Sequence, residues 1–571
     1  MRVDAIKTTY NCDVAICGGG LAGLTLARQL KLQMPDISVI VIDKLERPLP
    51  EAAFKVGEST TEAGAYYLSD TLQLKEYLSK YHLYKLGFRF FFGDAAGPFH
   101  QRPEFGLSEF PVVPSFNVDR GVLENDLRQF NAEAGVTMLE GCAVQDMTLS
   151  SGRKMHEVLF QDGKDGSRGK VRSRWVVDAT GRRRFIQRKL NLLKEFGKPC
   201  SAVWFRLGGR IDISDLVPHE EQLWHNRVPG NIRYYSTNHL MGRGYWVWII
   251  PLPSDSTSIG IDALEDIHPF SGFNTYESAL RWLKKFEPVF GAYIEGRAPM
   301  DFLCMRKYSY SSRQVFSSQR WACVGEAGVF ADPLYAPATD MIAIANSMTT
   351  EMIRRDRTGD LTPNLVTSFN LSIIALNDAL TRNIQVGYPL FSNSVVMAAK
   401  IMWDTAAGWA LLAPQIYNEI FVDAEKNMKV RKAKASYFLL AQQIHRLFVD
   451  WEAKSSGRGT FAFIDFLKVP LLLELRQRNL FGGKSAQELV DDHVFNMEKI
   501  EELAQVIFLL AVEDVMPKRL KEFPPSMWLN AWGVSLHPQR WEADKLFAPT
   551  TRPRDLSNVK DQIRRLFRFA S

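Results

Sequence analysis

Three glycines near the N-terminus constrain the fold of this 571-residue chain more than any other feature. Gly18, Gly20 and Gly23 are spaced as GxGxxG, directly after the apolar run DVAIC and at the start of a segment with helical spacing. The first glycine permits a tight turn, the second lets a pyrophosphate approach the backbone, and the third lets a helix pack closely on a strand. The pattern predicts a parallel βαβ unit that binds a dinucleotide.

An acidic residue follows the glycines where such a unit needs one. Asp43 lies 20 residues after Gly23, at the end of a second apolar run, ISVIVID, where a carboxylate can hold ribose hydroxyls. A chance glycine turn is the alternative, but strand, turn, helix and acid all agree. We expect Leu21, Ala22 and Lys44 to complete the cofactor cradle.

The chain divides by pattern into two parts. Strand-like and helix-like segments alternate up to about residue 340, and long helical segments follow. We therefore expect an α/β nucleotide-binding body over residues 1–350, with a β-sheet substrate subdomain formed by about 85–115 and 195–310. Residues 351–571 are predicted to form a helical C-terminal domain that covers a substrate pocket.

Composition narrows the class of protein. A net charge of +6 over this length gives no reason to expect nucleic acid as a partner. The six cysteines are scattered without a CxxC pair, which favours reduced thiols over disulfides, and we expect no metal. The N-terminus carries charges where a signal peptide has an apolar core, and we find no apolar run of about 18 residues, so we expect a cytoplasmic protein without an integral membrane segment.

Four further segments narrow the dinucleotide to FAD. They are FKVGEST (54–60), a helix opening in FNVDRGVLENDLRQF (116–130), VVDATGR (176–182) and CVGEAGVFADP (323–333). Together they resemble the Rossmann-like, glutathione-reductase-type FAD fold of aromatic hydroxylases and their relatives. The resemblance implies these cofactor contacts: Val56, Gly57, Glu58, Ser59, Arg120, Gly181, Gly325, Asp332 and Pro333.

The hexapeptide WVWIIP (246–251) adds a second motif on this scaffold. Read as a strand, it places Trp246, Trp248 and Ile250 on one face and is ended by Pro251, which has no N–H. The WxWxIP pattern resembles that of flavin-dependent halogenases. In that family, reduced flavin and oxygen give a C4a-hydroperoxide, a halide attacks it to form hypohalous acid, and the tryptophans keep the organic substrate away. Core packing of a buried strand is the alternative.

The resemblance also implies a catalytic lysine, in a segment like YKLGFRF (84–90), which makes Lys85 the candidate. Its amine would bind hypohalous acid through N–H donors or form a haloamine. Read as a strand, Lys85, Gly87 and Arg89 share one face, opposite an apolar face. Spacing alone favours a solvent-facing lysine. Lys55 is the rival, which we assign to the flavin side.

Residues 331–346, ADPLYAPATDMIAIAN, bear on halide and substrate. Halogenases hold halide partly through backbone N–H groups of a small-residue loop, which implies Pro337, Ala338 and Thr339 here. The loop departs from the family in lacking glycine, and Pro337 has no N–H. Tryptophan halogenases carry a glutamate where this chain has Tyr335, whereas phenol and pyrrole halogenases lack it. The resemblance therefore implies a phenol-like or pyrrole-like substrate, free or tethered to a carrier protein.

The helices after residue 345 offer Met402, Trp403 and Trp409 as linings of the substrate cavity, with ordinary helix-core packing as the alternative. DATG stands where single-component hydroxylases have a DG motif, and no second GxGxxG follows a strand. We therefore expect FAD to arrive as FADH2 from a separate flavin reductase. With O2 and a halide ion, the enzyme would chlorinate or brominate an electron-rich aromatic. A flavin monooxygenase (hydroxylase or epoxidase) and a non-catalytic FAD-binding protein remain alternatives, and a homodimer stays open.

Overall fold

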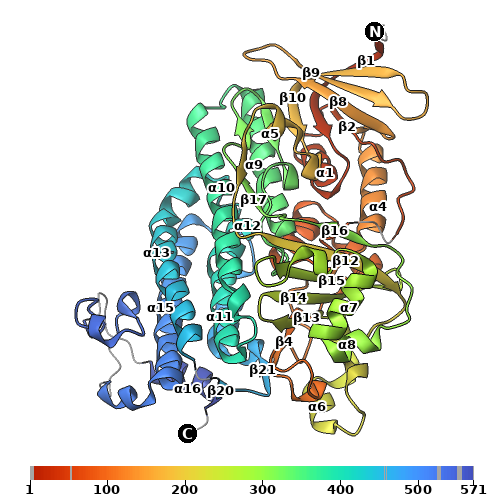
Figure 1. Ribbon diagram of the computed structural model, residues 1–571. Coiled ribbons are helices and arrows are strands. Elements are labelled where there is room, and N and C mark those ends of the chain that lie inside the picture. Colours follow the sequence, from red (N-terminus) through yellow and green to blue (C-terminus); the bar gives the residue numbers. More distant parts are fainter. Residues whose placement is uncertain are drawn as a thin grey trace.

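Two eight-stranded sheets and a set of long helices make up the protein (Figure 1). The structure is a computed structural model that describes residues 6–51, 55–455, 457, 459–523, 529–548 and 556–569. The two sheets occupy one flank of the molecule, and the long helices stand side by side along the other. This arrangement confirms the predicted α/β fold with a helical C-terminal part.

The first sheet contains the predicted βαβ unit. Strand β1 (Ile6–Cys17) leads through helix α1 (Leu21–Gln33) to β2 (Val39–Ile42), which lies parallel to β1. On its other side β1 pairs in parallel with β10 (Arg168–Asp178). The sheet is completed by β7 (Thr137–Leu139), β8 (Cys142–Thr148), β9 (His156–Asp162), β18 (Phe316–Ser317) and β19 (Trp321–Cys323). Buried Val and Ile fill β2, as expected for a strand covered on both faces.

The second sheet has the strand order β16-β12-β15-β14-β13-β4-β5-β21. Its strands are β4 (Phe88–Phe91), β5 (Glu104–Gly106), β12 (Cys200–Gly208), β13 (Thr237–Gly242), β14 (Tyr245–Leu252), β15 (Ser256–Leu264), β16 (Leu303–Met305) and β21 (Phe463–Asp465). Strand β21 comes from the C-terminal part and pairs in parallel with β5, which would otherwise be an edge strand. The sheet thus joins segments from both sides of residue 350, and the division into domains at that point stays a prediction.

Strand β14 contains the WVWIIP hexapeptide. The side chains alternate as predicted: Trp246, Trp248 and Ile250 belong to one hydrophobic cluster, and Val247 and Ile249 belong to another. The prediction that proline 251 ends the strand is wrong, because β14 continues to residue 252 and pairs there with β15. Pairing with β13 stops at position 249, so the proline lies on a stretch with one neighbour, where proline is tolerated.

The C-terminal part is built mainly from long helices. They are α9 (Ala338–Thr358), α10 (Pro363–Val386), α11 (Ser394–Ala407), α12 (Ala413–Tyr417), α13 (Ala424–Lys454), α14 (Pro470–Asn479) and α15 (Ala486–Val515). Met402, Trp403 and Trp409 are buried in this core. Among the described residues, one helical stretch, Ser394–Tyr417, is long and apolar enough to cross a membrane, and most of it is buried inside the protein.

Candidate active site

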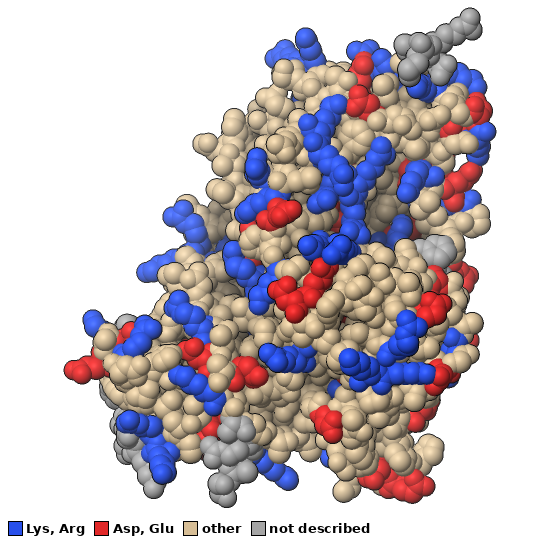
Figure 2. Space-filling view, viewed as in Figure 1, with Lys and Arg blue, Asp and Glu red and all other residues tan. Residues whose placement is uncertain are grey.

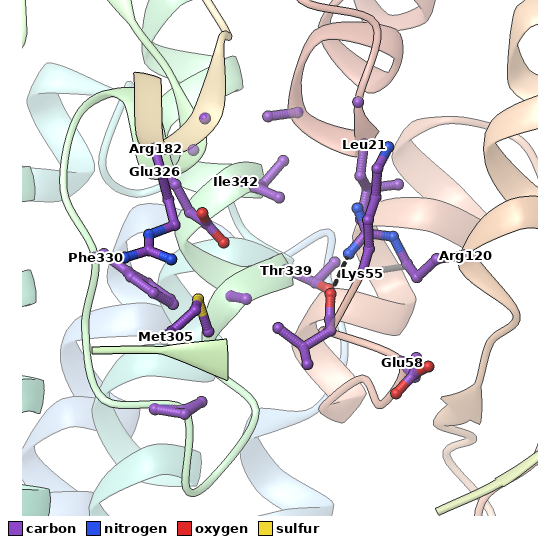
Figure 3. A pocket seen from close by; sticks show the side chains of 18 of the residues that line it. Leu21, Lys55, Glu58, Arg120, Arg182, Met305, Glu326, Phe330, Thr339 and Ile342 are labelled. Atoms are coloured by element: carbon purple, nitrogen blue, oxygen red, sulfur yellow. Dashed lines mark hydrogen bonds between the residues drawn. The ribbon is translucent and has the colours of Figure 1, made fainter. Parts of the chain in front are cut away.

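A cavity of about 730 Å³ lies between the glycine turn of the first sheet and strand β14 of the second. Figure 3 shows Leu21, Lys55 and Arg120 on one wall and Glu326 and Phe330 on the opposite wall. The predicted residues that line the cavity are Gly18, Gly20, Leu21, Ala22, Asp43, Lys44, Val56, Gly57, Glu58, Ser59, Arg120, Gly181, Trp246, Trp248, Ile250, Gly325, Pro333, Pro337, Ala338 and Thr339. The predicted residues outside this lining are Gly23, Lys85, Pro251 and Asp332.

The glycine turn has the geometry of a pyrophosphate cradle. A Cβ atom on Gly18, whose φ is +117°, would lie 2.2 Å from the Ala179 carbonyl oxygen, and one on Gly23 would lie 2.0 Å from the Gly18 carbonyl oxygen. A Cβ atom on Gly20 would meet no described atom within 4 Å and would project into the cavity. Gly20 also precedes α1 without a capping side chain, so the N–H groups of the first turn are available to a phosphate.

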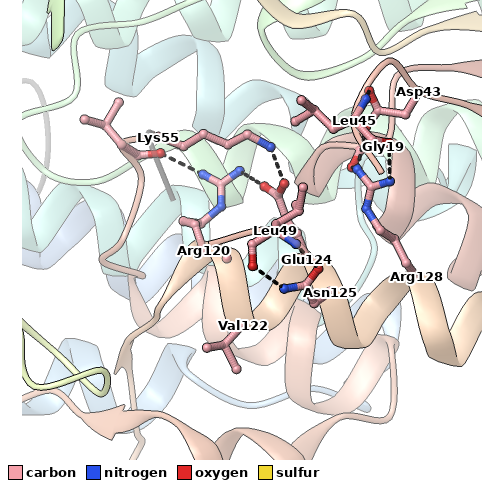
Figure 4. A network of polar contacts seen from close by, with 12 residues as sticks. Gly19, Asp43, Leu45, Leu49, Lys55, Arg120, Val122, Glu124, Asn125 and Arg128 are labelled. Carbon is pink, nitrogen blue, oxygen red and sulfur yellow. Dashed lines mark hydrogen bonds and ion pairs between the residues drawn. The ribbon is translucent and has the colours of Figure 1, made fainter. Parts of the chain in front are cut away.

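Asp43 is held in place by an arginine that the sequence analysis did not name. Arg128 donates to Asp43 Oδ2 at 2.5 Å and to the Gly19 carbonyl oxygen at 2.8 Å (Figure 4). Arg128 lies on helix α4 (Arg120–Glu133), two turns after the predicted Arg120. The i, i+4, i+8 spacing of Arg120, Glu124 and Arg128 was the sequence pattern that could have revealed it.

Arg120 ties the KVGES segment to helix α4. Its guanidinium donates to the Val56 carbonyl oxygen at 2.7 Å and to Glu124 Oε1 at 2.5 Å (Figure 4). Lys55 pairs with the other oxygen of Glu124 and lines the cavity. Lys55 therefore lies at the cofactor cavity, on the side to which we assigned it.

Cations surround the opening of the cavity. Lys44, Arg182 and Arg183 are exposed and line it, and Figure 2 shows Lys and Arg side chains gathering around a hollow on this face. Arg183 donates to the Val144 carbonyl oxygen, and neither arginine has a carboxylate within salt-bridge distance in the described part of the chain. The GRRR run after VVDAT was the overlooked sequence pattern. The opening therefore suits an anionic ligand such as a dinucleotide pyrophosphate.

The side chains of Trp246, Trp248 and Ile250, here called the tryptophan wall, face the cavity. The two indole rings lie 5.4 Å apart between centroids. The indole N–H of Trp246 donates to the Tyr388 phenol at 3.1 Å, and that of Trp248 donates to the Ser258 hydroxyl at 3.2 Å. Both rings are thereby fixed at one side of the cavity.

Lys85 lies just outside the cavity and is only 2% exposed, so the solvent-facing alternative is wrong. The predicted continuous strand over 84–90 is also wrong, because Gly87, with φ of +83°, turns the chain before β4 begins. Lys85 Nζ donates to the Thr60 carbonyl oxygen at 2.9 Å and lies 3.5 Å from the centroid of the Phe88 ring. Phe88 itself lines the cavity.

Burial lowers the pKa of Lys85 to about 7, and the nearby Glu62 and Asp340 carboxyls oppose this only in part. A lysine with such a pKa is a mixture of ammonium and free amine near neutral pH. The site therefore provides both a hydrogen-bond donor and a nucleophilic amine behind the Phe88 ring.

The predicted halide loop leads into the N-terminus of helix α9. Ala336 has φ of +51°, in the left-handed region that favours glycine, and Pro337 is the N-cap residue. No side chain among the described residues caps the helix, so the N–H groups of Ala338 and Thr339 belong to an uncapped first turn that faces the cavity. Proline at the N-cap removes no donor from that turn, and the helix dipole there favours an anion.

Two residues of the same segment point elsewhere. The prediction that Asp332 contacts the cofactor is contradicted by its position: its carboxylate is fully buried and accepts from the phenols of Tyr308 and Tyr388. Tyr335, for which the resemblance implies the position of the glutamate of tryptophan halogenases, donates to Asp404 Oδ2 at 2.9 Å.

Comparison with known proteins agrees with this geometry. A family model described as an FAD binding domain matches residues 11–258. Flavin-dependent halogenase chlA of Dictyostelium discoideum is 24% identical over 436 residues, which cover 70% of each chain. The chain is thus similar to flavin-dependent halogenases over most of its length. FAD is its cofactor.

Two other comparisons are with a curated brominase and with a solved halogenase structure. The 1H-pyrrole-2-carbonyl-(peptidyl-carrier protein) brominase of Pseudoalteromonas luteoviolacea is 26% identical over 339 residues, 57% of this chain and 72% of that protein. The solved structure of halogenase PltM in complex with phloroglucinol and FAD is 18% identical, with a TM-score of 0.58 over 89% of this chain and 97% of that one. The second likeness shows the shared fold.

Proposed function

We propose that this halogenase chlorinates or brominates a phenol-like or pyrrole-like aromatic substrate through hypohalous acid that is relayed to Lys85. The placement of Lys85 carries the proposal: a buried amine lies next to the flavin cavity and is separated from it by the Phe88 ring. The reduced flavin, when bound, would activate O2, and O2 activated in this way would oxidise halide to hypohalous acid. FADH2 would come from a separate flavin reductase, and O2 and halide are the co-substrates.

The two steps of the proposed reaction take place on opposite sides of Phe88. On the flavin side, the tryptophan wall excludes the organic substrate and water from the oxidation step. On the other side, the Lys85 amine holds the hypohalous acid by hydrogen bonding or takes the halogen as a haloamine, and directs it to the substrate. Because the substrate is excluded from the flavin side, oxygen transfer to the substrate does not compete with the oxidation of halide.

Halide would bind at the N-terminus of helix α9. The free N–H groups of Ala338 and Thr339 face the cavity, and a helix N-terminus attracts anions. This placement removes the difficulty raised by Pro337, since the donors follow the proline instead of including it.

An electron-rich ring fits the absence of the glutamate. Tyr335 occupies its position and is hydrogen-bonded to Asp404, so it leaves no free carboxylate there to assist a weakly activated ring. The brominase named above acts on a carrier-tethered pyrrole, and the PltM structure holds phloroglucinol, which is a phenol. These relatives support a phenol-like or pyrrole-like substrate, either free or carrier-tethered.

A product assay tests the proposal. The protein is incubated with a flavin reductase, FAD, NADH, chloride or bromide, and a panel of phenols, pyrroles and carrier-tethered pyrroles. The masses of the products are then measured by mass spectrometry. We expect a halogen mass shift that follows the halide supplied. A product that gains oxygen would identify a monooxygenase, and tight FAD binding without any product would leave a non-catalytic flavoprotein.

A further inference from the structure

Behind the tryptophan wall, the indole N–H of Trp246 enters a buried polar cluster. The phenol oxygen of Tyr388, which accepts that N–H at 3.1 Å, lies 3.0 Å from Asp262 Oδ1 and 3.0 Å from Asp332 Oδ2. The Tyr308 phenol lies 3.2 Å from the Tyr388 oxygen and 3.0 Å from Asp332 Oδ2. The four side chains that form this cluster with Trp246 are fully buried: Asp262, Tyr308, Asp332 and Tyr388.

The cluster connects distant parts of the chain at one point. Asp262 stands on β15 directly opposite Trp246 in the strand register, and Asp332 lies in the loop before α9. Tyr308 follows β16, and Tyr388 lies between α10 and α11. The orientation of Trp246 is therefore tied to the helical part that follows residue 350.

Counting hydrogens assigns the charge in the cluster. Tyr388 has one phenol hydrogen but stands within hydrogen-bond distance of two carboxyl groups, so one contact needs a hydrogen from a carboxyl. Asp332 accepts from two phenols and, at 3.3 Å, from the Leu334 N–H, as a carboxylate would. Asp262 Oδ2 is buried and has no hydrogen-bond partner in the described part of the chain, which would be costly for an ion. Asp262 is thus the protonated member.

The titratable groups in and around the cluster are consistent with one negative charge, on Asp332. Burial, followed by repulsion from Asp332, raises the pKa of Asp262 well above its usual value. Burial also raises the pKa of the Cys200 thiol, which faces the pair, and lowers the pKa of His239, whose ring lies 5.6 Å from that of Trp246. The thiol and the imidazole are therefore neutral near pH 7.

We propose that Tyr388 is a positioning residue for the tryptophan wall. It accepts hydrogens from Trp246 and from protonated Asp262, donates its own to ionised Asp332, and so locks the indole across one side of the flavin cavity. The role of the wall rests on the proposed function, but the locking of the indole does not. A freed indole opens the cavity to water, and the O2 consumed by the reduced flavin is then released as hydrogen peroxide instead of oxidising halide.

The experiment compares Tyr388→Phe and Asp262→Asn with wild type and with Tyr67→Phe. Tyr67 is a matched control, because its phenol is also buried and also has two hydrogen-bond partners, Gln29 and Asn346, away from the wall. The proteins are labelled with 5-fluorotryptophan, and Trp246→Phe assigns the Trp246 signal among the 13 tryptophans by ¹⁹F NMR. Product and hydrogen peroxide per FADH2 consumed are measured alongside FAD affinity.

We expect Tyr388→Phe to move the Trp246 signal and to lower product per FADH2 by roughly fivefold, the factor that loss of one hydrogen bond allows. FAD affinity should not change, and Tyr67→Phe should behave as wild type. Asp262→Asn should keep the wild-type signal near pH 7, because its amide replaces the carboxyl hydrogen that Tyr388 accepts.

Three results would overturn the proposal. The first is a Trp246 signal that does not move in Tyr388→Phe, and the second is a signal that moves while product per FADH2 stays unchanged. The third is a Trp246 signal that moves as far in Asp262→Asn as in Tyr388→Phe. Should no variant and no wild-type sample halogenate anything, the proposed function fails, while the NMR comparison still decides whether the cluster holds the indole.

Discussion

Replacing Lys85 by methionine should stabilise the fold while abolishing halogenation. Burial lowers the pKa of Lys85 from 10.5 to about 7, and each pH unit of that change corresponds to about 1.36 kcal/mol. The unfolded chain holds its proton up to the higher pKa, so the buried lysine opposes folding by about 5 kcal/mol below pH 7. Loss of the hydrogen bond to Thr60 and of the contact with the Phe88 ring offsets about 2 kcal/mol.

Urea unfolding near pH 6 measures the net gain, which we expect to be about 3 kcal/mol for Lys85→Met. The gain should shrink as the pH rises towards 10, because the unfolded lysine then loses its proton as well. Lys55→Met is the control: Lys55 is partly exposed and pairs with Glu124, so its loss should not stabilise the protein. A Lys85→Met variant that is less stable than wild type near pH 6 would refute the claim that burying charged Lys85 lowers the free energy of unfolding.

Other outcomes follow from the same geometry. Gly20→Val should fold normally but lose FAD affinity, which an FAD titration measures, because its side chain enters the cavity. Gly18→Ala should lower the thermal unfolding midpoint, which calorimetry measures, because its Cβ atom would overlap the backbone. The rate of FAD association, measured by stopped flow, should fall with added salt, and less steeply once Arg182 and Arg183 are replaced by glutamine. NADH alone should not bleach the bound FAD, as followed by absorbance. The stability of wild type should fall as pH rises through the raised pKa of Asp262, and Asp262→Asn should make that fall smaller in pH-dependent unfolding, with the other buried carboxyls, Asp332 and Asp340, still contributing.

Local sequence patterns predicted those parts of the site that depend on neighbouring residues. The spacing of Gly18, Gly20 and Gly23 predicted a turn whose close contacts lie within the βαβ unit and with Ala179 and Thr180, directly after its neighbour β10. The alternation of Trp246 and Trp248 along one strand was enough to place both rings on one face. In both cases the period of the secondary structure determines the direction of the side chain.

Other parts depended on contacts that a local pattern does not contain. Spacing alone favoured a solvent-facing Lys85, because a local pattern does not reveal that the positive φ of Gly87 interrupts the strand. Asp332 was assigned to the cofactor by its motif, yet its partner Tyr388 is 56 residues away in the chain. The cluster behind the wall exists only once the helical part packs on the sheet.

The most direct test of the central role of Lys85 is a single turnover with pre-reduced FAD. The loaded protein is mixed with oxygen, bromide and an accepted aromatic substrate, and flavin reoxidation and brominated product are followed together. We predict that Lys85→Ala and Lys85→Arg reoxidise the flavin as wild type does. Lys85→Ala should give no brominated product because alanine lacks the amine. Lys85→Arg should also give none if the halogen is carried as a haloamine, because guanidinium stays charged, whereas slight product would indicate hydrogen bonding alone. Lys55→Ala should retain product per bound flavin. Wild-type product from Lys85→Ala, with none from a flavin-loaded Lys55→Ala, would contradict the account.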